Sequence, residues 1–80
     1  MERSIFSADQ RKLTDLLRQV RLGAGLRQDD LAKRLERPQS FVSKYESGER
    51  GLDLLELREI CDALGISLQS FVERLEKSLQ

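Results

Sequence analysis

One stretch constrains the fold of this chain more than any other, residues 28–48, which read QDDLAKRLERPQSFVSKYESG. Its first part spaces three apolar residues as one buried helical stripe: Leu31, Ala32 and Leu35. Pro38 interrupts this pattern, because proline fixes its own φ, lacks an N–H and pushes the residue before it out of the α region. A second helix is predicted over residues 39–47, with Gly48 ending it. The stretch therefore predicts two short helices joined by a tight turn.

The second of these helices is predicted to carry polar side chains on its outer face. Its inner face takes Val42, Tyr45 and, at least in part, Phe41. The outer residues are Gln39, Ser40, Ser43 and Lys44. Glutamine can form two hydrogen bonds with adenine, serine can donate or accept, and lysine can reach guanine or a phosphate. Two short helices with such a second member are typical of a helix-turn-helix whose recognition helix enters the major groove of DNA.

Length and composition set limits on the rest. Eighty residues make one domain, residues 1–80, with a core thin enough to favour partnership with another chain. The sequence has no signal peptide and no apolar run near the ~18 residues of a membrane span, so we expect a cytoplasmic protein with no membrane contact. The single Cys61 cannot form an internal disulfide and is expected in the core. Because the chain has no His, no metal site and no cofactor are expected.

The net charge of the chain is zero, with 14 Lys and Arg against 14 Asp and Glu. The charges are unevenly distributed: residues 1–50 carry eleven basic against eight acidic residues, and residues 51–80 carry three against six. A chain of this kind can still present a positive face to phosphates, because local patches matter more than totals. We therefore expect DNA binding that depends on specific contacts, with weak non-specific affinity at physiological salt.

A further helix is predicted before the central pair. Residues 1–6 are expected to form a flexible arm. Ser7 and Gln10 have the S-x-x-Q form of a capping box, so the first helix begins at about Ala8 and ends near Gly23. Its apolar stripe is Leu13, Leu16, Leu17 and Val20.

Two more helices are predicted after the pair. Asp53 and Glu56 form a second capping box, and Gly65 ends the helix that follows. The buried stripe of this helix is Leu54, Leu57, Ile60, Cys61 and Leu64. Ser67 then caps a terminal helix over residues 67–79. The prediction is an all-α domain of five short helices.

The terminal helix has more apolar surface than so small a domain needs. Leu68 and Phe71 can fill the core, which leaves Val72, Leu75 and Leu79 partly exposed. A symmetric homodimer would cover these three residues. The alternative is that all five apolar residues of this helix close the core of a monomer.

These residues together resemble a known family. The run GLRQDDLAKRLERPQSFVSKYESGERGLDLLELREICDALGISL is similar to the helix-turn-helix domain of the phage lambda repressor and Cro group, the XRE family. The match extends from about Leu16 to Phe71 and rests on one set of residues at a specific spacing: Gln28, Leu31, Ala32, Ser43, Glu46, Gly48 and the segment 63–66. The resemblance implies a five-helix, lambda-repressor-like domain that binds palindromic operators as a homodimer and regulates transcription, here as a repressor.

The resemblance also implies roles for individual residues. The positions that contact base edges, or lie near them, are Gln39, Ser40, Ser43 and Lys44. Phosphate contacts fall on Gln28 and Arg50, and on the backbone N–H groups around Gln28 and Gln39. An ion pair between the first helix and the end of the recognition helix falls on Arg21 and Glu46, and removal of one partner would be costly.

Three positions depart from the family pattern. Arg27 stands where a capping Thr or Ser is common, so a cap is lost and a phosphate contact can be gained. Glu36 stands where the turn usually has Gly, which requires either a strained backbone or a different turn. Pro38 stands at a usual Ser or Thr cap position. The fold prediction is unaffected, but the base contacts are less well defined.

Two functions remain open at this point. The first is a sequence-specific DNA-binding regulator, a homodimer on double-stranded DNA. The second is a protein-interaction module on the same fold, such as an antitoxin or an adaptor subunit with a protein partner, which the zero net charge and the apolar terminal helix favour slightly. An enzyme is not expected, because the chain has no His, no Cys-based nucleophilic pair and no glycine loop of the phosphate-binding type.

Overall fold

The computed structural model describes residues 7–80, which form five helices and no strand. The helices are α1 (Ala8–Gly23), α2 (Gln28–Leu35), α3 (Gln39–Ser47), α4 (Leu54–Leu64) and α5 (Leu68–Leu79). The predicted all-α, five-helix architecture is confirmed. The arm expected over residues 1–6 lies outside the described residues.

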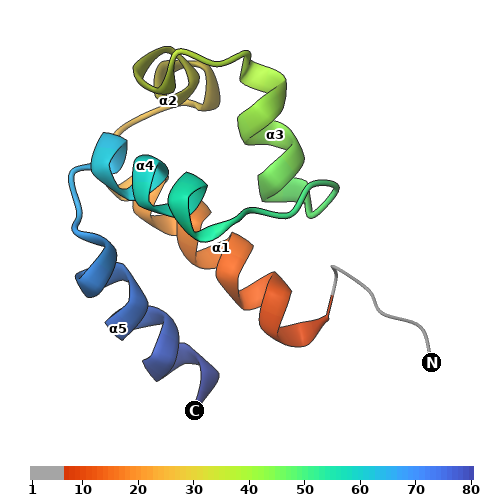
Figure 1. Ribbon diagram of the computed structural model, residues 1–80, viewed down its shortest axis with the longest axis vertical. Helices are drawn as coiled ribbons and strands as arrows, with labels where there is room; N and C mark the ends of the chain where they lie inside the picture. The colour runs from red at the N-terminus through yellow and green to blue at the C-terminus, as the bar shows by residue number, and fades with distance from the viewer. Residues whose placement is uncertain (1–6) are drawn as a thin grey trace.

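The longest helix, α1, crosses the middle of the molecule obliquely (Figure 1). Both α3 and α5 pack against α1, while α2 packs against α3 and α4, and α4 packs against α5. The α2–turn–α3 unit occupies one end of the molecule, and α5 lies beside α1 towards the other end. The unit is therefore held on a scaffold formed by α1, α4 and α5.

Side-chain caps fix where three of the helices begin. The hydroxyl of Ser7 accepts a hydrogen bond from the backbone N–H of Gln10 at 3.1 Å. Asp53 and Glu56 form a complete capping box, in which each carboxylate accepts from the backbone N–H of the other residue, at 2.7 and 3.0 Å. The hydroxyl of Ser67 caps α5 in the same way as Ser7 caps α1. These bonds satisfy N–H groups that have no partner within a helix, and they confirm the predicted helix starts.

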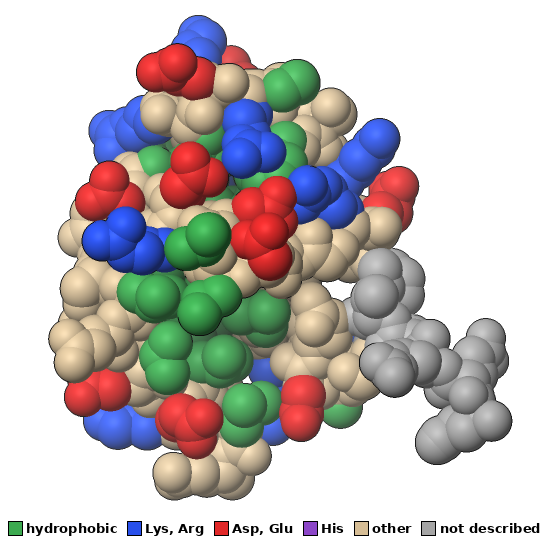
Figure 2. Space-filling view, viewed as in Figure 1, with side chains coloured by type: hydrophobic (Ala, Val, Ile, Leu, Met, Phe, Trp, Pro, Cys, Tyr) green, Lys and Arg blue, Asp and Glu red, His purple; other side chains and the backbone are tan. Residues whose placement is uncertain are grey.

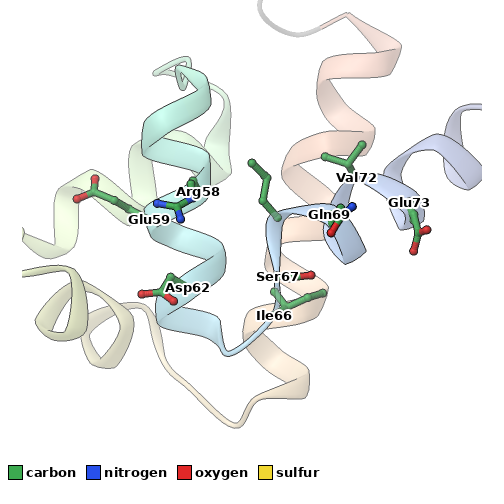
Figure 3. A pocket seen from close by; sticks show the side chains of 9 residues that line it. Arg58, Glu59, Asp62, Ile66, Ser67, Gln69, Val72 and Glu73 are labelled. Carbon is green, nitrogen blue, oxygen red and sulfur yellow. The ribbon is translucent and has the colours of Figure 1, made fainter.

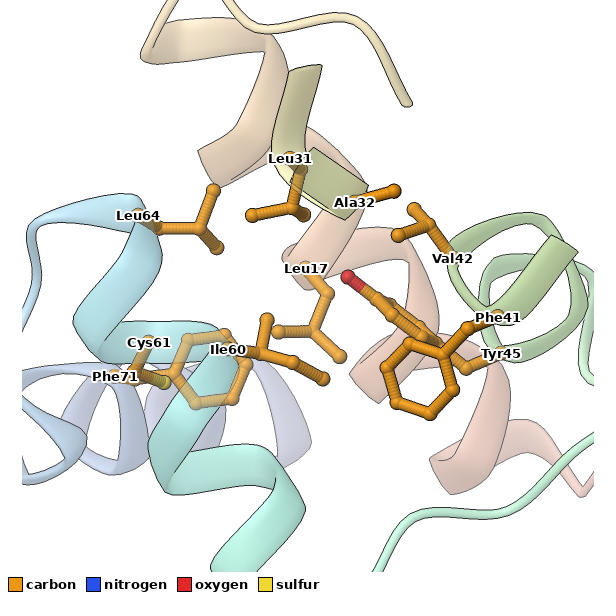
Figure 4. Packing of buried hydrophobic residues seen from close by; sticks show 10 residues of the cluster. All are labelled: Leu17, Leu31, Ala32, Phe41, Val42, Tyr45, Ile60, Cys61, Leu64 and Phe71. Atoms are coloured by element: carbon orange, nitrogen blue, oxygen red, sulfur yellow. The ribbon is translucent and has the colours of Figure 1, made fainter. Parts of the chain in front are cut away.

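A single core joins all five helices (Figure 4). Its buried apolar residues are Leu17, Leu31, Ala32, Phe41, Val42, Tyr45, Ile60, Cys61, Leu64 and Phe71. The predicted stripe of α4 is wrong in one member, because Leu54 is 65% exposed. Leu57 is half-buried and Ile60 is 1% exposed, so burial increases along α4 and its first turn lies at the edge of the core.

Candidate nucleic-acid interface

The turn between α2 and α3 is tight and contains one strained residue. Glu36 follows α2 in the left-handed conformation, with φ of 56° and ψ of 44°. The next backbone N–H, that of Arg37, donates to the carbonyl of Ala32 at 3.0 Å and so closes the end of α2. Pro38 is extended and stands at the N-cap of α3, which begins at Gln39 without a side-chain cap. Of the two possibilities raised by the sequence, the strained backbone at Glu36 is the one observed.

The two faces of α3 differ in burial as predicted. Val42 and Tyr45 are fully buried, and Phe41 is 8% exposed. All four residues predicted to meet base edges lie on the opposite face, where Ser43 is half-buried and the other three are exposed: Gln39, Ser40 and Lys44. Ser47, which sequence reasoning did not single out, is also exposed on this helix. At about 100° per residue, Ser47 follows Ser43 on the same face and extends the polar surface by one turn.

A nearly buried ion pair fastens α3 to α1. The Arg21 guanidinium donates through Nε to Oε2 of Glu46 at 2.7 Å and through Nη2 to Oε1 at 3.0 Å. The two side chains are only 7% and 5% exposed. Arg21 also donates through Nη1 to the carbonyl of Leu26 at 2.9 Å. The hydrogen bond to Glu46 is the main reason that the pKa of Arg21 is raised.

Two glutamines connect this ion pair to the first turn of α3. Nε2 of Gln28 donates to Oε1 of Glu46 at 3.0 Å, and Nε2 of Gln39 donates to Oε1 of Gln28 at 3.1 Å. Because an ionised carboxylate only accepts hydrogen bonds, Glu46 requires the amide nitrogen of Gln28 to point towards it. The amide oxygen of Gln28 then faces Gln39, whose own oxygen remains available as an acceptor. The orientation of the first side chain of α3 therefore depends on a buried charge.

Arg27, expected to contact a phosphate, stands at the N-cap of α2 and is paired with carboxylates of the first turn of that helix. Its guanidinium donates through Nε and Nη2 to the two carboxylate oxygens of Asp30, both at 3.2 Å, and lies 3.7 Å from Asp29. Asp30 also accepts from the backbone N–H of Arg27 at 2.9 Å. The hydrogen bond from the Arg27 side chain is the main reason that the pKa of Asp30 is lowered. The Arg27 side chain is nevertheless 77% exposed and accessible to solvent.

Arg50, also expected at a phosphate, makes a second pair of this kind. It donates through Nη1 and Nη2 to the two oxygens of Glu56, at 3.1 and 2.8 Å. Its guanidinium carbon lies 4.8 Å from the centre of the Phe41 ring, close enough for a cation–π interaction. The backbone N–H of Arg50 donates to the carbonyl of Lys44 at 3.2 Å. These contacts hold Arg50 beside the last turn of α3.

Sequence reasoning missed Arg37 and the carboxylates that pair with the arginines. The guanidinium of Arg37 lies 4.4 Å from the centre of the Phe41 ring and donates to Glu59 at 3.3 Å. No local pattern links Arg37 to Glu59, which are 22 residues apart. The pairing of Arg50 with Glu56 had a weak signal, because the predicted capping box at Asp53 fixes the Glu56 carboxylate six residues after Arg50.

An apolar surface covers part of α4 and α5. Leu54, Leu55 and Val72 are 65%, 73% and 37% exposed, while Leu75 and Leu79 are half-buried. Figure 2 shows hydrophobic side chains gathered over this region, with acidic side chains around them. Of the three residues predicted at a dimer interface, Val72 is thus the most accessible, and Leu54 and Leu55 form accessible apolar surface that the prediction did not include.

A groove of about 790 Å³ lies between α4 and α5 (Figure 3). Its lining combines apolar and charged side chains: Arg58, Glu59, Asp62, Ile66, Ser67, Leu68, Gln69, Val72 and Glu73. Three carboxylates and one guanidinium give the lining a net negative charge. The groove is therefore chemically unlike the polar outer face of α3.

Other kinds of site find no support in residues 7–80. No cluster of three or more His, Cys, Asp or Glu side chains in this range could hold a metal ion. Across the same part of the chain, no helix combines the length and apolar character needed to cross a membrane. Cys61 is fully buried, and burial raises the pKa of its thiol to about 11.

The fold and this interface define a helix-turn-helix protein. The family model described as "Helix-turn-helix domain" matches residues 12–75, which is most of the chain. The chain therefore belongs to the helix-turn-helix family. No curated protein sequence matches it.

Solved structures refine this assignment. An XRE-family like protein from Pseudomonas syringae pv. tomato str. DC3000 is 42% identical, with a TM-score of 0.84 over 91% of this chain and 89% of that chain. The wild-type restriction-modification controller protein C.Esp1396I is 29% identical, with a TM-score of 0.84 over 91% of this chain and 94% of that chain. The same controller, as a tetramer in complex with its natural 35 base-pair operator, is 30% identical, with a TM-score of 0.81 over 89% of this chain and 93% of that chain. Family and fold are those of XRE-type DNA-binding transcription regulators, which are not enzymes.

Proposed function

We propose that this protein is a homodimeric transcriptional repressor that reads a palindromic operator with α3 in the major groove. The observation that carries the proposal is the outer face of α3, where short polar side chains and one lysine lie opposite a fully buried inner face. Such a helix fits the major groove, which is wide enough for one α-helix. A dimer bound across a promoter would exclude the polymerase by occupying its site.

The base contacts are assigned to Gln39, Ser40, Ser43 and Lys44. Gln39 has the clearest chemistry, because its contact with Gln28 leaves its amide oxygen and one N–H available. An oxygen acceptor beside an N–H donor matches the N6 and N7 edge of adenine. The phosphate contacts are assigned to Gln28, Arg27 and Arg50.

Dimerisation is assigned to the α4–α5 surface. Val72, Leu75 and Leu79 contribute from α5, and the exposed Leu54 and Leu55 extend the same apolar surface along α4. In a dimer with a two-fold axis, Arg58 of each copy could approach the acidic side chains that line the groove of the other copy. The controller protein found as a tetramer on its operator supports assembly on DNA for this fold.

Selection of bound duplexes from a random DNA library, at two salt concentrations, tests the proposal. We expect enrichment of a palindrome with half-sites about one helical turn apart, roughly 34 Å. Gln39→Ala should relax the preference at one or two base pairs, and Lys44→Ala should lower affinity and weaken its salt dependence, each at about 1–3 kcal/mol. If Gln39→Ala lowered the affinity for all DNA sequences equally, a base contact by Gln39 would be excluded. Weak, salt-sensitive binding without enrichment would overturn the proposal as a whole.

One observation favours a second candidate function, a protein-interaction module such as an antitoxin or an adaptor. The acidic, partly apolar groove between α4 and α5 could take a basic amphipathic helix of another protein. Two results together would establish this function. The wild type would capture such a partner and Val72→Glu would not, and the wild type would bind no DNA duplex selectively. A cytoplasmic location remains a prediction for either function.

A further inference from the structure

Two arginines are linked to the edges of the outer face of α3, one through its neighbour in the sequence and one through its backbone. At about 100° per residue, the exposed face of this helix lies between Gln39 on one side and Lys44 on the other. Arg27 directly precedes Gln28, which contacts Gln39. The backbone of Arg50 is hydrogen-bonded to Lys44. A helix lying in the major groove has a phosphate backbone along each edge, so both arginines lie on the sides where phosphates would be.

Both guanidinium groups are already occupied by carboxylates of the same chain. Asp30 accepts two hydrogen bonds from Arg27, and Glu56 accepts two from Arg50. A bidentate carboxylate takes up two N–H groups that would otherwise hold a phosphate in the same paired way. Each pair also has no net charge, so it attracts a distant phosphate much less than a free guanidinium would. The arginines beside α3 therefore contribute little to long-range attraction in the free protein.

We propose that Asp30 and Glu56 set the preference of this protein for its operator over other DNA, by neutralising Arg27 and Arg50 beside the recognition helix. The inference rests on the proposed function. Non-specific binding comes almost entirely from charge attraction to phosphates, so neutralised arginines weaken it. On an operator, base contacts hold α3 in the groove and bring phosphates next to both arginines. The Arg27 and Arg50 side chains are 77% and 39% exposed, so a phosphate that is held there can reach each guanidinium and replace the carboxylate.

Isosteric variants separate charge from shape. Asp30→Asn and Glu56→Gln keep an oxygen that can accept the backbone N–H of Arg27 or Asp53, but each removes one negative charge. Asp15→Asn is the matched control. It adds the same charge on the exposed face of α1, where Asp15 forms no ion pair with any described residue. All three variants therefore have the same net charge.

The measurement is the Kd for the selected operator and for a scrambled duplex of equal length, between 50 and 200 mM salt. For Asp30→Asn and Glu56→Gln we expect tighter binding of the scrambled duplex. The slope of log K against log salt should steepen by about 0.9 for each phosphate newly neutralised, or about 3.5-fold in affinity over this fourfold range. Operator affinity should change less, so the ratio of the two Kd values falls. In an Arg27→Met background, Asp30→Asn should no longer steepen the slope.

Slopes and Kd ratios of Asp30→Asn and Glu56→Gln that match those of Asp15→Asn would overturn the inference. Thermal unfolding shows whether each variant is folded at the assay temperature, and the two pairs are far enough apart in sequence to test the inference independently. A wild type that selects no duplex would overturn the proposed function. The scrambled-duplex slopes would still show whether the carboxylates neutralise the arginines, so the two failures are distinguishable.

Discussion

Nε of Arg21 lies 2.7 Å from a carboxylate oxygen of Glu46, although the two residues are 25 positions apart and belong to α1 and α3. The carbonyl of Leu26 and the amide of Gln28 complete the hydrogen bonding around this pair. A nearly buried pair of charges is tolerated only when its polar atoms are satisfied in this way. The pair therefore links the scaffold, the position of α3 and the orientation of Gln28.

Removal of one charge of this pair should be strongly destabilising. We expect Glu46→Ala to lower the free energy of unfolding by about 3–5 kcal/mol, because it leaves the Arg21 guanidinium buried without its partner. Urea unfolding, monitored by circular dichroism, measures this change in the free energy of unfolding. The double variant Arg21→Met, Glu46→Leu is the control, and it should be more stable than Glu46→Ala because no charge is left buried. A loss below about 1 kcal/mol in Glu46→Ala would show that the site is hydrated.

The hydroxyl of Tyr45 is buried and has no hydrogen-bond partner among the described residues. Figure 4 shows it pointing into the apolar cluster. A buried polar group without a partner costs about 1–3 kcal/mol. We therefore expect Tyr45→Phe to unfold at an equal or higher urea concentration than the wild type. Tyr45→Ala, which removes the ring, should lose about 3–5 kcal/mol. A clear loss of stability in Tyr45→Phe would instead reveal a partner for the hydroxyl, such as a buried water.

The left-handed conformation of Glu36 predicts a stabilising substitution. A residue with a β-carbon pays about 1–2 kcal/mol in this region, which glycine does not. Glu36 is exposed, so little packing is lost on its removal. We expect Glu36→Gly to raise the free energy of unfolding by about 0.5–1 kcal/mol, after the greater freedom of glycine in the unfolded chain is subtracted. Lys33→Gly, at an exposed position within α2, is the control and should lose about 1 kcal/mol. No gain in Glu36→Gly would mean that the turn relaxes around glutamate without strain.

The pair of Arg50 with Glu56 should make stability depend on acid pH. The hydrogen bond from Arg50, followed by that from the backbone of Asp53, lowers the pKa of Glu56 to about 2 from an ordinary value of 4.5. Since the folded pKa lies below the unfolded one, the stabilisation is complete above the unfolded pKa and is lost as the pH falls towards the folded value. We expect the Tm of the wild type to fall more than that of Glu56→Gln between about pH 5 and pH 2. Parallel profiles of Tm against pH would contradict a stabilising role for the Glu56 charge.

Much of the fold was predictable because its determinants are local. The caps at Ser7, Asp53 and Ser67 bind N–H groups three residues away, and the inner and outer faces of α3 follow from helical periodicity alone. The outer face of α3, which carries Gln39 and Lys44 and makes up most of the candidate interface, was therefore predictable from the sequence. The Arg21–Glu46 pair was expected only through a family resemblance, since its partners lie on different helices.

What the tertiary structure decided concerns contacts between helices. The exposure of Leu54 depends on how far the neighbouring helices reach along α4, which apolar periodicity does not specify. The pairing of Arg37 with Glu59 and the stacking of Arg50 on Phe41 depend on the docking of α4 against the helix-turn-helix unit. The sequence by itself determined where helices begin and which faces they bury, because those preferences arise within a few residues. Only the packed structure determined which charges are free and which are paired, because side chains distant in the sequence meet only after the helices have docked.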